Sequence, residues 1–310
     1  RHNHAFIVVG DQASPPEFRL QNCTFVSLEQ QLQSGLKTAE LCPHNTYARK
    51  NVGYLLAMRN DSDIIVDTDD DNFPKEGFWK TRQVRHTVKK LAGAGWTNVY
   101  RYFTGRDRTI WPRGLPLDHI FADSGSFDEI PTVSVECVIQ QGLVDNNPDV
   151  DAIFRLAFSL PVTFRDDRRL ALGSRTWSPF NSQNTSWWKQ VFPLMYLPAH
   201  CSFRMTDIWR SFIAQRIAWE NGWCILYHEP TVWQERNAHD LLKDFADEIP
   251  GYLGNARICR ELDNLPLKPG PASLGDNLLA CYERLVQIGT VGKEEIPLVR
   301  AWLEDVESIP

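Results

Sequence analysis

A short apolar run that ends in a burst of acidic residues constrains this chain more than any other feature. Residues 64–72 read IIVDTDDDN, so that four carboxylates occupy the five positions 67–71. The apolar run predicts a buried strand, and open α/β sheets bind ligands at the carboxyl ends of such strands. Carboxylates this close repel one another unless a cation or solvent compensates. The pattern favours a Mg²⁺ or Mn²⁺ site completed by phosphate oxygens, with a solvated acidic turn as the alternative.

Within this segment, Asp69 and Asp71 are the predicted metal ligands, and Asp67 and Asp70 are expected to hold or orient the bound group. The motif by itself indicates metal and phosphate chemistry. It does not indicate sugar transfer, because nucleotidyltransferases, phosphatases and magnesium-dependent hydrolases use similar acidic pairs.

The segments around the acidic motif predict an α/β fold with a wound sheet. The expected order is strand, helix, strand, helix, strand. The expected ranges are strands at 5–10, 64–67 and 99–103 and helices at 28–34, 47–60 and 78–91, the last of them basic and amphipathic.

The second half of the chain predicts a strand, a long loop and then mostly helices. We expect a strand at 132–141, a loop at 163–188, a helix at 208–221, a strand at 223–227 and charged helices at 273–289 and 294–308. The Pro/Gly stretch at 265–275 is predicted to connect to a helical appendage. The predicted domains are a catalytic domain at 1–255 and a C-terminal helical appendage at 256–310 that packs on it.

Composition narrows the partners of the chain. The formal net charge of −6 argues against a nucleic-acid binder, but not against a nucleotide whose phosphates share a cation. The seven cysteines form no C-x-x-C pair, which argues against a zinc cluster. No apolar run is long enough to span a membrane. Sequons at Asn22, Asn60 and Asn184 weakly favour a secretory lumen, and the start without Met is compatible with a lost anchor or signal.

Several motifs in order resemble the STELLO-type glycosyltransferases. They are YARKNVGYLLAM before IVDTDDDN, then GLVDNNPDVDAIFRL, TDIWRSFIAQRIAWENGW and RNAHDLLKDFADEIPGY. The resemblance spans roughly residues 5–252, and the C-terminal helices contribute nothing to it. It implies a GT-A-like fold, a Rossmann-like mixed sheet flanked by helices, with a nucleotide-sugar donor and a divalent cation. For eukaryotic members it also implies the Golgi, whereas microbial chains of this kind would be cytoplasmic.

The resemblance also implies roles for single residues. Asp207, at the start of a late helix, is the predicted general base of an inverting enzyme, or alternatively a helix N-cap. His239 is predicted to complete the metal site with Asp69 and Asp71, with His228 as the alternative.

Other residues are predicted to contact the substrates. Donor-binding candidates are Gly10 and Asp11 at the first strand end, Asp67, and Arg49 (with Lys50) beside a phosphate or carboxylate. Acceptor-binding candidates are Asp149 and Asp151, which are equally compatible with a turn and a helix cap, and Trp187, which would stack on a sugar unless it packs in the core.

The predicted function is metal-dependent transfer of a sugar from a nucleotide-sugar, UDP-linked, to a hydroxyl acceptor such as a glycan. A sugar nucleotidyltransferase is one alternative, but the first strand is followed by VVGDQASPPEF, which lacks the Gly-rich loop of those enzymes. The other alternative is a catalytically silent GT-A-like scaffold of a glycan-synthesis complex.

Overall fold

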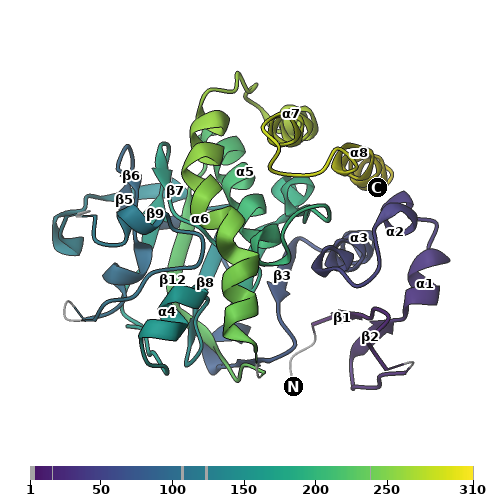
Figure 1. Ribbon diagram of the computed structural model, residues 1–310, viewed down its shortest axis with the longest axis horizontal. Helices are drawn as coiled ribbons and strands as arrows, with labels where there is room; N and C mark the ends of the chain where they lie inside the picture. The colour runs from purple at the N-terminus through teal and green to yellow at the C-terminus, as the bar shows by residue number, and fades with distance from the viewer. Residues whose placement is uncertain (1–3, 16, 106–107, 123–124, 238, 310) are drawn as a thin grey trace.

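A mixed β-sheet forms the centre of the molecule (Figure 1). The computed structural model describes residues 4–15, 17–105, 108–122, 125–237 and 239–309, and in these ranges the sheet has eight strands. In spatial order they are β3 (Ile64–Thr68), β11 (Asn184–Trp188), β8 (Ile139–Asp145), β12 (Ile225–Gln234), β9 (Leu170–Leu172), β5 (Arg85–Leu91) and β7 (Thr132–Glu136), and β4 (Asn72–Pro74) also pairs with β12. The α/β class with helices flanking a mixed sheet is confirmed, and this arrangement is consistent with a GT-A-like fold.

Strand directions bring three carboxyl ends to one edge of the sheet. Strands β3 and β8 both run antiparallel to β11, and β12 runs parallel to β8. The ends of β3, β8 and β12 therefore point the same way, and β11 begins at that edge. Loops that follow parallel-directed strands are the usual ligand-binding elements of such sheets.

Helices cover the sheet, with α6 (Leu241–Asp263) lying across one side in Figure 1 and α5 (Thr206–Glu220) close to the sheet. Helix α5 is buried on nearly all sides and contributes Trp209 and Phe212 to the main core. The remaining elements include β1 (Phe6–Val9), β2 (Cys23–Val26), α1 (Leu28–Leu32), α2 (Lys37–Leu41), α3 (Lys50–Arg59), β6 (Gly95–Trp96), α4 (Ala152–Ala157), β10 (Thr176–Trp177), α7 (Leu274–Gln287) and α8 (Glu295–Glu307), and the 3₁₀ turns η1 (Tyr47–Arg49), η2 (Glu76–Trp79), η3 (Val99–Tyr102), η4 (Leu117–His119), η5 (Phe127–Glu129), η6 (Lys189–Met195), η7 (Phe203–Met205) and η8 (Pro271–Ser273).

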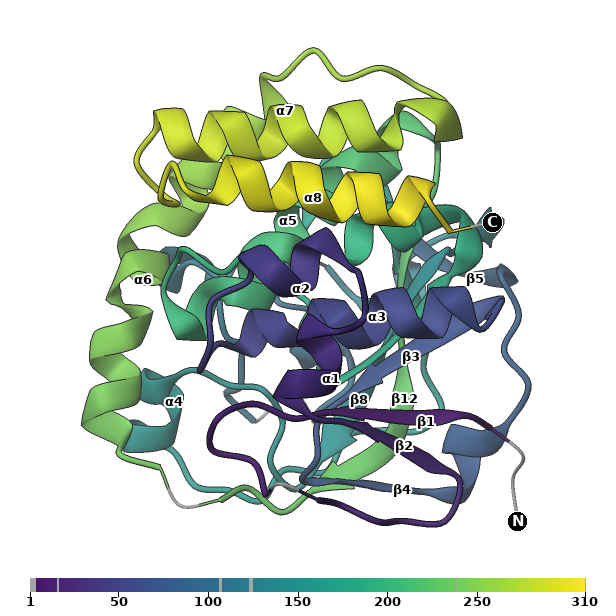
Figure 2. The same ribbon diagram turned by 90° about the vertical axis from the view of Figure 1, so that its right-hand side faces the viewer.

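The two C-terminal helices lie side by side above α2 and α3 (Figure 2). Two buried acids fix α8 there. Glu295 accepts hydrogen bonds from the Tyr196 hydroxyl and from the backbone N–H of His200 (2.7 Å). Asp305 accepts from the backbone N–H groups of Lys37 (3.1 Å) and Thr38 (2.8 Å). Because the N-cap residue of α2 offers no side-chain hydrogen bond, Asp305 satisfies that helix end from outside.

Two predicted elements have the wrong type. The basic helix predicted at 78–91 is instead the turn η2 and strand β5, in which Val88 faces the core and the flanking Thr87 and Lys89 face away. The basic side chains suggested the solvent-exposed face of a helix. The segment is a strand because β5 pairs with both β7 and β9. The segment predicted as a strand at 99–103 is instead η3, a buried turn. The prediction failed because a short apolar run does not distinguish a strand from a buried helical turn.

Two further predictions missed strands. The strand predicted at 132–141 is two strands, β7 and β8, that occupy different places in the sheet. The loop predicted at 163–188 contains β9, β10 and β11, whose polar residues are buried and hydrogen-bonded. Asn184 is one of them: its amide donates to the backbone of Leu143 and to Thr231. The sequon at Asn184 is therefore closed to glycosylation in the folded protein.

The other predicted helices and strands are present within a few residues of their predicted bounds, including α7 and α8 after the connector, except that β12 continues from the predicted end at 227 to Gln234. The division at residue 255 stays a prediction, and α6 continues unbroken across it. In the part of the chain that the structure describes, no helix has both the length and the apolar character needed to cross a membrane.

The outside cap on α2 yields a stability prediction. Replacing Asp305 with Ala leaves two N–H groups of α2 without partners, so the free energy of unfolding falls by about 1–2 kcal/mol in urea denaturation. Asp276→Ala on α7 is the control, since that carboxylate is exposed and its ion pair with Lys268 is long at 3.8 Å. An equal effect of the two substitutions would contradict the capping role.

Candidate active site

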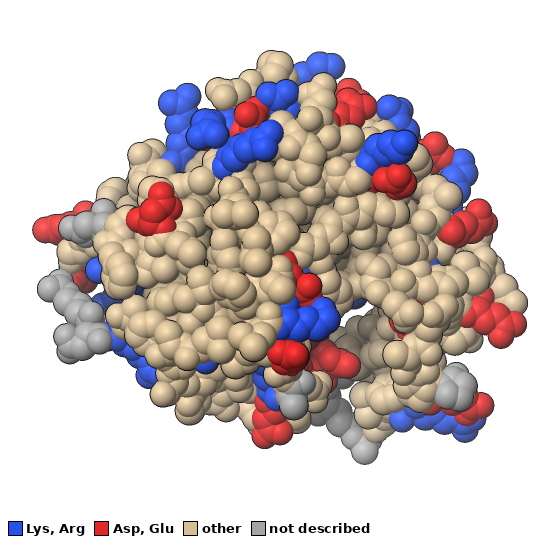
Figure 3. Space-filling model, in the orientation of Figure 1, with Lys and Arg blue, Asp and Glu red and all other residues tan. Residues whose placement is uncertain are grey.

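A polar cavity of about 270 Å³ opens at the edge of the sheet where β3, β8 and β12 end. The surface is hollowed on this side of the molecule, and acidic and basic side chains gather at the rim (Figure 3). The cavity is lined by Tyr47, Asp69, Asp70, Asp71, Arg113, Asp149, Arg155, Gln183, Phe203, Arg204, Asp207, Gln234, Arg236, Asn237 and His239. Of the predicted site residues, Asp69, Asp71, Asp149, Asp207 and His239 meet here.

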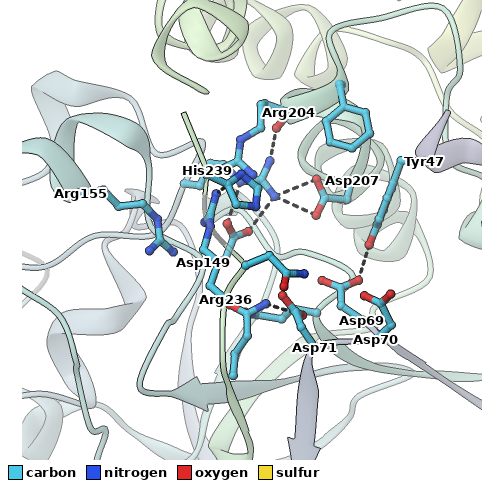
Figure 4. Close-up of a pocket in the computed structure, with 15 residues that line it drawn as sticks. Tyr47, Asp69, Asp70, Asp71, Asp149, Arg155, Arg204, Asp207, Arg236 and His239 are labelled. Carbon is cyan, nitrogen blue, oxygen red and sulfur yellow. Dashed lines mark hydrogen bonds and ion pairs between the residues drawn. The ribbon is translucent and has the colours of Figure 1, made fainter. Parts of the chain in front are cut away.

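The acidic segment after β3 forms one wall, with Asp69, Asp70 and Asp71 close together (Figure 4). Asp69 Oδ1 accepts from the Tyr47 hydroxyl (2.6 Å) and from Lys50 Nζ (3.1 Å). Asp71 Oδ1 accepts from the Gln234 amide (2.8 Å). The Oδ2 atoms of both residues, and both oxygens of Asp70, receive no hydrogen bond from the described residues. Burial raises the pKa of Asp69, although Lys50 and Tyr47 oppose that effect.

Asp67 lies beneath this wall and is 2% exposed. Its carboxylate pairs with Lys50 (2.7 Å) and Arg210 (3.1 Å) and accepts from the Tyr54 hydroxyl (2.6 Å). These contacts join β3 to α3 and α5. They also hold Lys50 where it reaches Asp69. Asp67 is therefore held beneath the wall by these partners and has no access to the cavity as a direct ligand.

Arg113 holds the two acids of the opposite wall. Its Nε and Nη2 donate to the two oxygens of Asp149 (2.7 and 2.8 Å), and Nη2 also contacts both oxygens of Asp207 (3.0 Å each). All three residues are buried. Burial alone would raise the pKa of Asp149, but the charge and hydrogen bonds of Arg113 hold it below its usual value. Asp207 lies in the first turn of α5 and its carboxylate faces the cavity.

A chain of hydrogen bonds links the two acidic walls. The Tyr47 hydroxyl donates to Asp69 and lies 2.8 Å from the Ser182 hydroxyl. Ser182 in turn contacts Asp207 Oδ2 through its backbone N–H (3.3 Å) and its hydroxyl (3.5 Å). Burial, followed by the charge of Asp69, raises the pKa of Tyr47 well above its usual value, so its phenol keeps the proton.

The third side of the cavity is basic. Arg204 donates to Glu248 (2.8 Å), and Arg236 donates to Asp244 (2.8 Å). His239 lies at this side, with Nδ1 3.3 Å from Asp244, so it lines the same cavity as Asp69 and Asp71 but is held among basic groups. Burial and then Arg236 lower its pKa, which leaves a neutral imidazole.

Several predicted residues lie outside the cavity. Arg49 is buried and donates to Gln31 and to the carbonyls of Ala39 and Cys42, while its neighbour Lys50 makes the carboxylate contacts. Trp187 is 0% exposed, so the core alternative is the one found, and Phe203 at 57% is an exposed aromatic of the cavity.

The remaining predicted residues also have structural contacts. Asp151 is the N-cap of α4, as its alternative predicted, and burial raises its pKa to about 6. The chain at Gly10 passes so close to Phe25 that a Cβ would lie 2.7 Å from that ring. Asp11 accepts from the backbone N–H of Thr46, at the start of the loop that carries Tyr47.

Sequence reasoning did not find the basic residues of the site. Arg113, Arg155, Arg204 and Arg236 come from four separate segments, so no local pattern marks them. The position of Arg236 just after β12 was the one available signal for a basic site residue. Because β12 runs parallel to β8, the two strands end at the same edge of the sheet.

The comparisons with known proteins agree with the resemblance inferred from the motifs. A family profile described as STELLO glycosyltransferases matches residues 204–310. "Probable glycosyltransferase STELLO1" of Arabidopsis thaliana is 24% identical over 98% of this chain. "Probable glycosyltransferase STELLO2" of the same plant is 25% identical over 97% of it. The chain is similar in sequence to the STELLO glycosyltransferases.

The relationship to the STELLO proteins extends further than the motifs indicated. The profile match reaches the C-terminus, so the expectation that the resemblance ends near residue 252 was wrong, and α7 and α8 belong to the shared part. The chain spans 41% of the length of each of these two relatives.

The Arg113 network yields a prediction about stability and pH. In Arg113→Gln, two buried carboxylates lose their countercharge, and the free energy of unfolding at pH 7 falls by about 3–5 kcal/mol. In the wild type the pKa of Asp149 is lowered, so its contribution is present above its unfolded pKa and is lost as the pH falls through the folded value. In the variant, burial raises that pKa against only the weaker charges of Arg204 and Arg155. The charged form is then penalised at pH 7, and the penalty disappears as Asp149 is protonated.

The stability loss in Arg113→Gln should therefore shrink between pH 7 and about pH 4, measured by urea unfolding at each pH. The control is Arg169→Gln, whose partner Glu229 lies at the surface and whose pair is expected to contribute about 1 kcal/mol or less. A loss that is independent of pH would refute this account of the network.

Proposed function

We propose that this chain transfers a sugar from a nucleotide-sugar diphosphate, UDP-linked, to a hydroxyl acceptor, with Mg²⁺ or Mn²⁺ bound at the acidic wall. The observation that carries the proposal is the pairing of that wall with Asp149 and Asp207 across one cavity at the carboxyl ends of the strands. The relationship to proteins named as glycosyltransferases supports the reaction class.

The acidic wall suits a divalent cation that shares its ligands with a diphosphate. Among the described residues, no three His, Cys, Asp or Glu side chains converge into a complete metal cage. Mg²⁺ and similar ions usually take only one or two carboxylates and complete their shell with phosphate and water. Asp69, Asp70 and Asp71 each keep at least one oxygen free of hydrogen bonds from the described residues, which fits that need. When bound, the cation would stabilise negative charge on the leaving diphosphate.

The acceptor side has two candidate bases, and the geometry favours Asp207. Asp149 is engaged by two nitrogens of Arg113, whereas Asp207 is contacted by Nη2 alone. Asp207 also accepts hydrogen bonds from Ser182 and from the backbone N–H of Ile208, but these donors are neutral. Asp207 is thus paired with one guanidinium nitrogen only, and it is the proposed proton acceptor for a substrate hydroxyl. Phe203, exposed at the cavity and edge-on to Tyr47 (6.0 Å between centroids), offers an apolar face for a sugar ring.

A catalytically silent scaffold is the second candidate function. One observation favours it: Arg113 contacts both oxygens of Asp149 and both oxygens of Asp207, so neither carboxylate has an oxygen free of the guanidinium. Hydrolysis of the donor by the wild type, followed by chromatography of the released nucleotide, separates the two. Donor hydrolysis that depends on Asp207 would identify the protein as an enzyme, whereas donor binding without hydrolysis would identify it as a scaffold.

The proposed donor site can be tested at Asp71. Asp71→Asn weakens UDP binding about tenfold or more in the presence of Mn²⁺, because the cation loses a charged ligand, and has no effect in the presence of a chelator. Calorimetric titration measures both conditions. Asp118→Asn is the control, since this carboxylate is exposed and lies outside the cavity. UDP binding that ignores both Mn²⁺ and the Asp71 substitution would remove the proposed donor site.

The proposed general base can be tested at Asp207. Asp207→Asn lowers kcat by about 10²–10⁴ while the affinity for UDP stays unchanged, because general-base catalysis acts only in the transition state. Steady-state kinetics and the same titration give the two values. A parallel loss of UDP affinity would assign Asp207 to donor binding instead.

A further inference from the structure

A second cavity of about 300 Å³ adjoins the candidate active site and shares Arg155, Arg236, Asn237 and His239 with it. Its other lining residues are Asn147, Phe158, Leu160 and Leu241. None of these lining residues carries a carboxylate. The acidic wall therefore lies at one end of the combined space, and a basic pocket lies at the other. In Figure 4, Arg155 lies on the far side of Asp149 and Arg236 from Asp69 and Asp70.

Arg155 is the cation of this pocket for which the described residues provide no carboxylate partner. Its Nη2 donates to the carbonyl of Pro148 (2.9 Å), and its Nη1 lies 3.5 Å from the Asn147 amide oxygen. Its Nε is buried and has no hydrogen-bond acceptor among the residues that the structure describes. Burial, and then the neighbouring charge of Arg236, lower its pKa to about 10. Arg155 is partly buried. A guanidinium held partly out of water without an anion is costly, so an anionic ligand would stabilise it.

Arg236 is only partly compensated. Its Nη2 donates to Asp244 and lies 3.1 Å from His239 Nδ1. Its Nε is also buried, without an acceptor among the described residues. Asp244 additionally lies 3.9 Å from Arg204 and 3.3 Å from His239, so one carboxylate is shared among several basic groups. The pocket therefore has an excess of positive charge and two unused N–H donors.

Guanidinium groups with free donors select oxyanions, because carboxylate and phosphate oxygens match their planar geometry. The acidic wall repels such an anion unless a cation intervenes, which makes the basic end the better place for a second anionic group. Phe158 and Leu160 add apolar surface beside the arginines, as a sugar ring requires, and Asn147 and Asn237 offer amides for hydroxyls.

We propose that the acceptor is an acidic sugar, a uronate or a sugar phosphate, whose oxyanion is bound by Arg155 and Arg236 in the second cavity. The inference rests on the proposed function and specifies its acceptor. The bound oxyanion would fix the sugar at one end, so that a hydroxyl at its other end faces Asp207.

The test compares sugars that differ in charge at one position. Glucose, glucuronate and glucose 6-phosphate are titrated by ligand-detected NMR into the full chain with UDP and Mn²⁺ present. We expect at least one charged sugar to bind about tenfold or more tightly than glucose, as a charge-assisted hydrogen bond provides. The sugar with the larger gain distinguishes a uronate from a phosphate acceptor. In Arg155→Gln the preference for the charged sugar over glucose disappears.

Arg260→Gln is the matched control, because Arg260 is an exposed arginine of α6 that lines neither cavity. It should keep the preference for the charged sugar. If Arg155→Gln does not fold, the wild type alone still decides, since the charged sugar should raise Tm at concentrations where glucose does not.

Two results would overturn the inference while the proposed function survives. They are tight UDP binding without any preference for a charged sugar, and an Arg155→Gln variant that loses UDP binding, which would assign the arginines to the donor diphosphate. A preference for charged sugars in a protein that does not bind UDP at all would instead overturn the proposed function, and with it the assignment of this pocket to an acceptor.

Discussion

Arg113 lies between Asp149 and Asp207, which reach the cavity from the loop after β8 and from the start of α5. Like charges at this distance repel strongly where water is excluded, so these two elements can meet only around a cation. Lys50 and Arg210 do the same for Asp67, which joins β3 to α3 and α5. The positions of the acidic wall, of α5 and of the β8 loop all follow from these compensated charges. The site is thus built from ion pairs that the fold cannot lose without exposing or repelling its own carboxylates.

Much of this edge of the sheet was predictable, because its acids follow recognisable elements. The apolar run before Asp67 marks a buried strand, and Asp207 lies in the first turn of a helix that was predicted to begin at residue 208, so Asp69, Asp71 and Asp207 were expected at element ends and are found there. The countercharges were not predictable in the same way. Arg113 lies in a loop without a periodic pattern, and its role depends on a meeting with Asp149 and Asp207 that only the tertiary structure creates.

The errors share a physical origin. Trp187 and Asn184 belong to β11, whose polar and aromatic sequence has the composition of a loop, yet the strand is buried between β3 and β8. Likewise, Lys89 and Lys90 in β5 suggested a wet helix face, although their neighbours pair with two other strands. Local composition cannot report such pairing, because hydrogen bonds to distant strands satisfy the polar backbone. The C-terminal helices, in contrast, carry a strong local period and were found, although their place beside α2 depends on Asp305 and Glu295.

A series of hydrogen bonds connects the acidic wall after β3 with the opposite wall. It runs from Asp69 through Tyr47 and Ser182 to Asp207. Tyr47 has one proton to give, and it now gives that proton to Asp69. A ligand that drew Asp69 away would free this proton, and Ser182, whose hydroxyl contacts both Tyr47 and Asp207, lies next in the series. The two acidic walls are therefore joined through hydrogen bonds, so a ligand bound at one wall alters the hydrogen bonding available at the other.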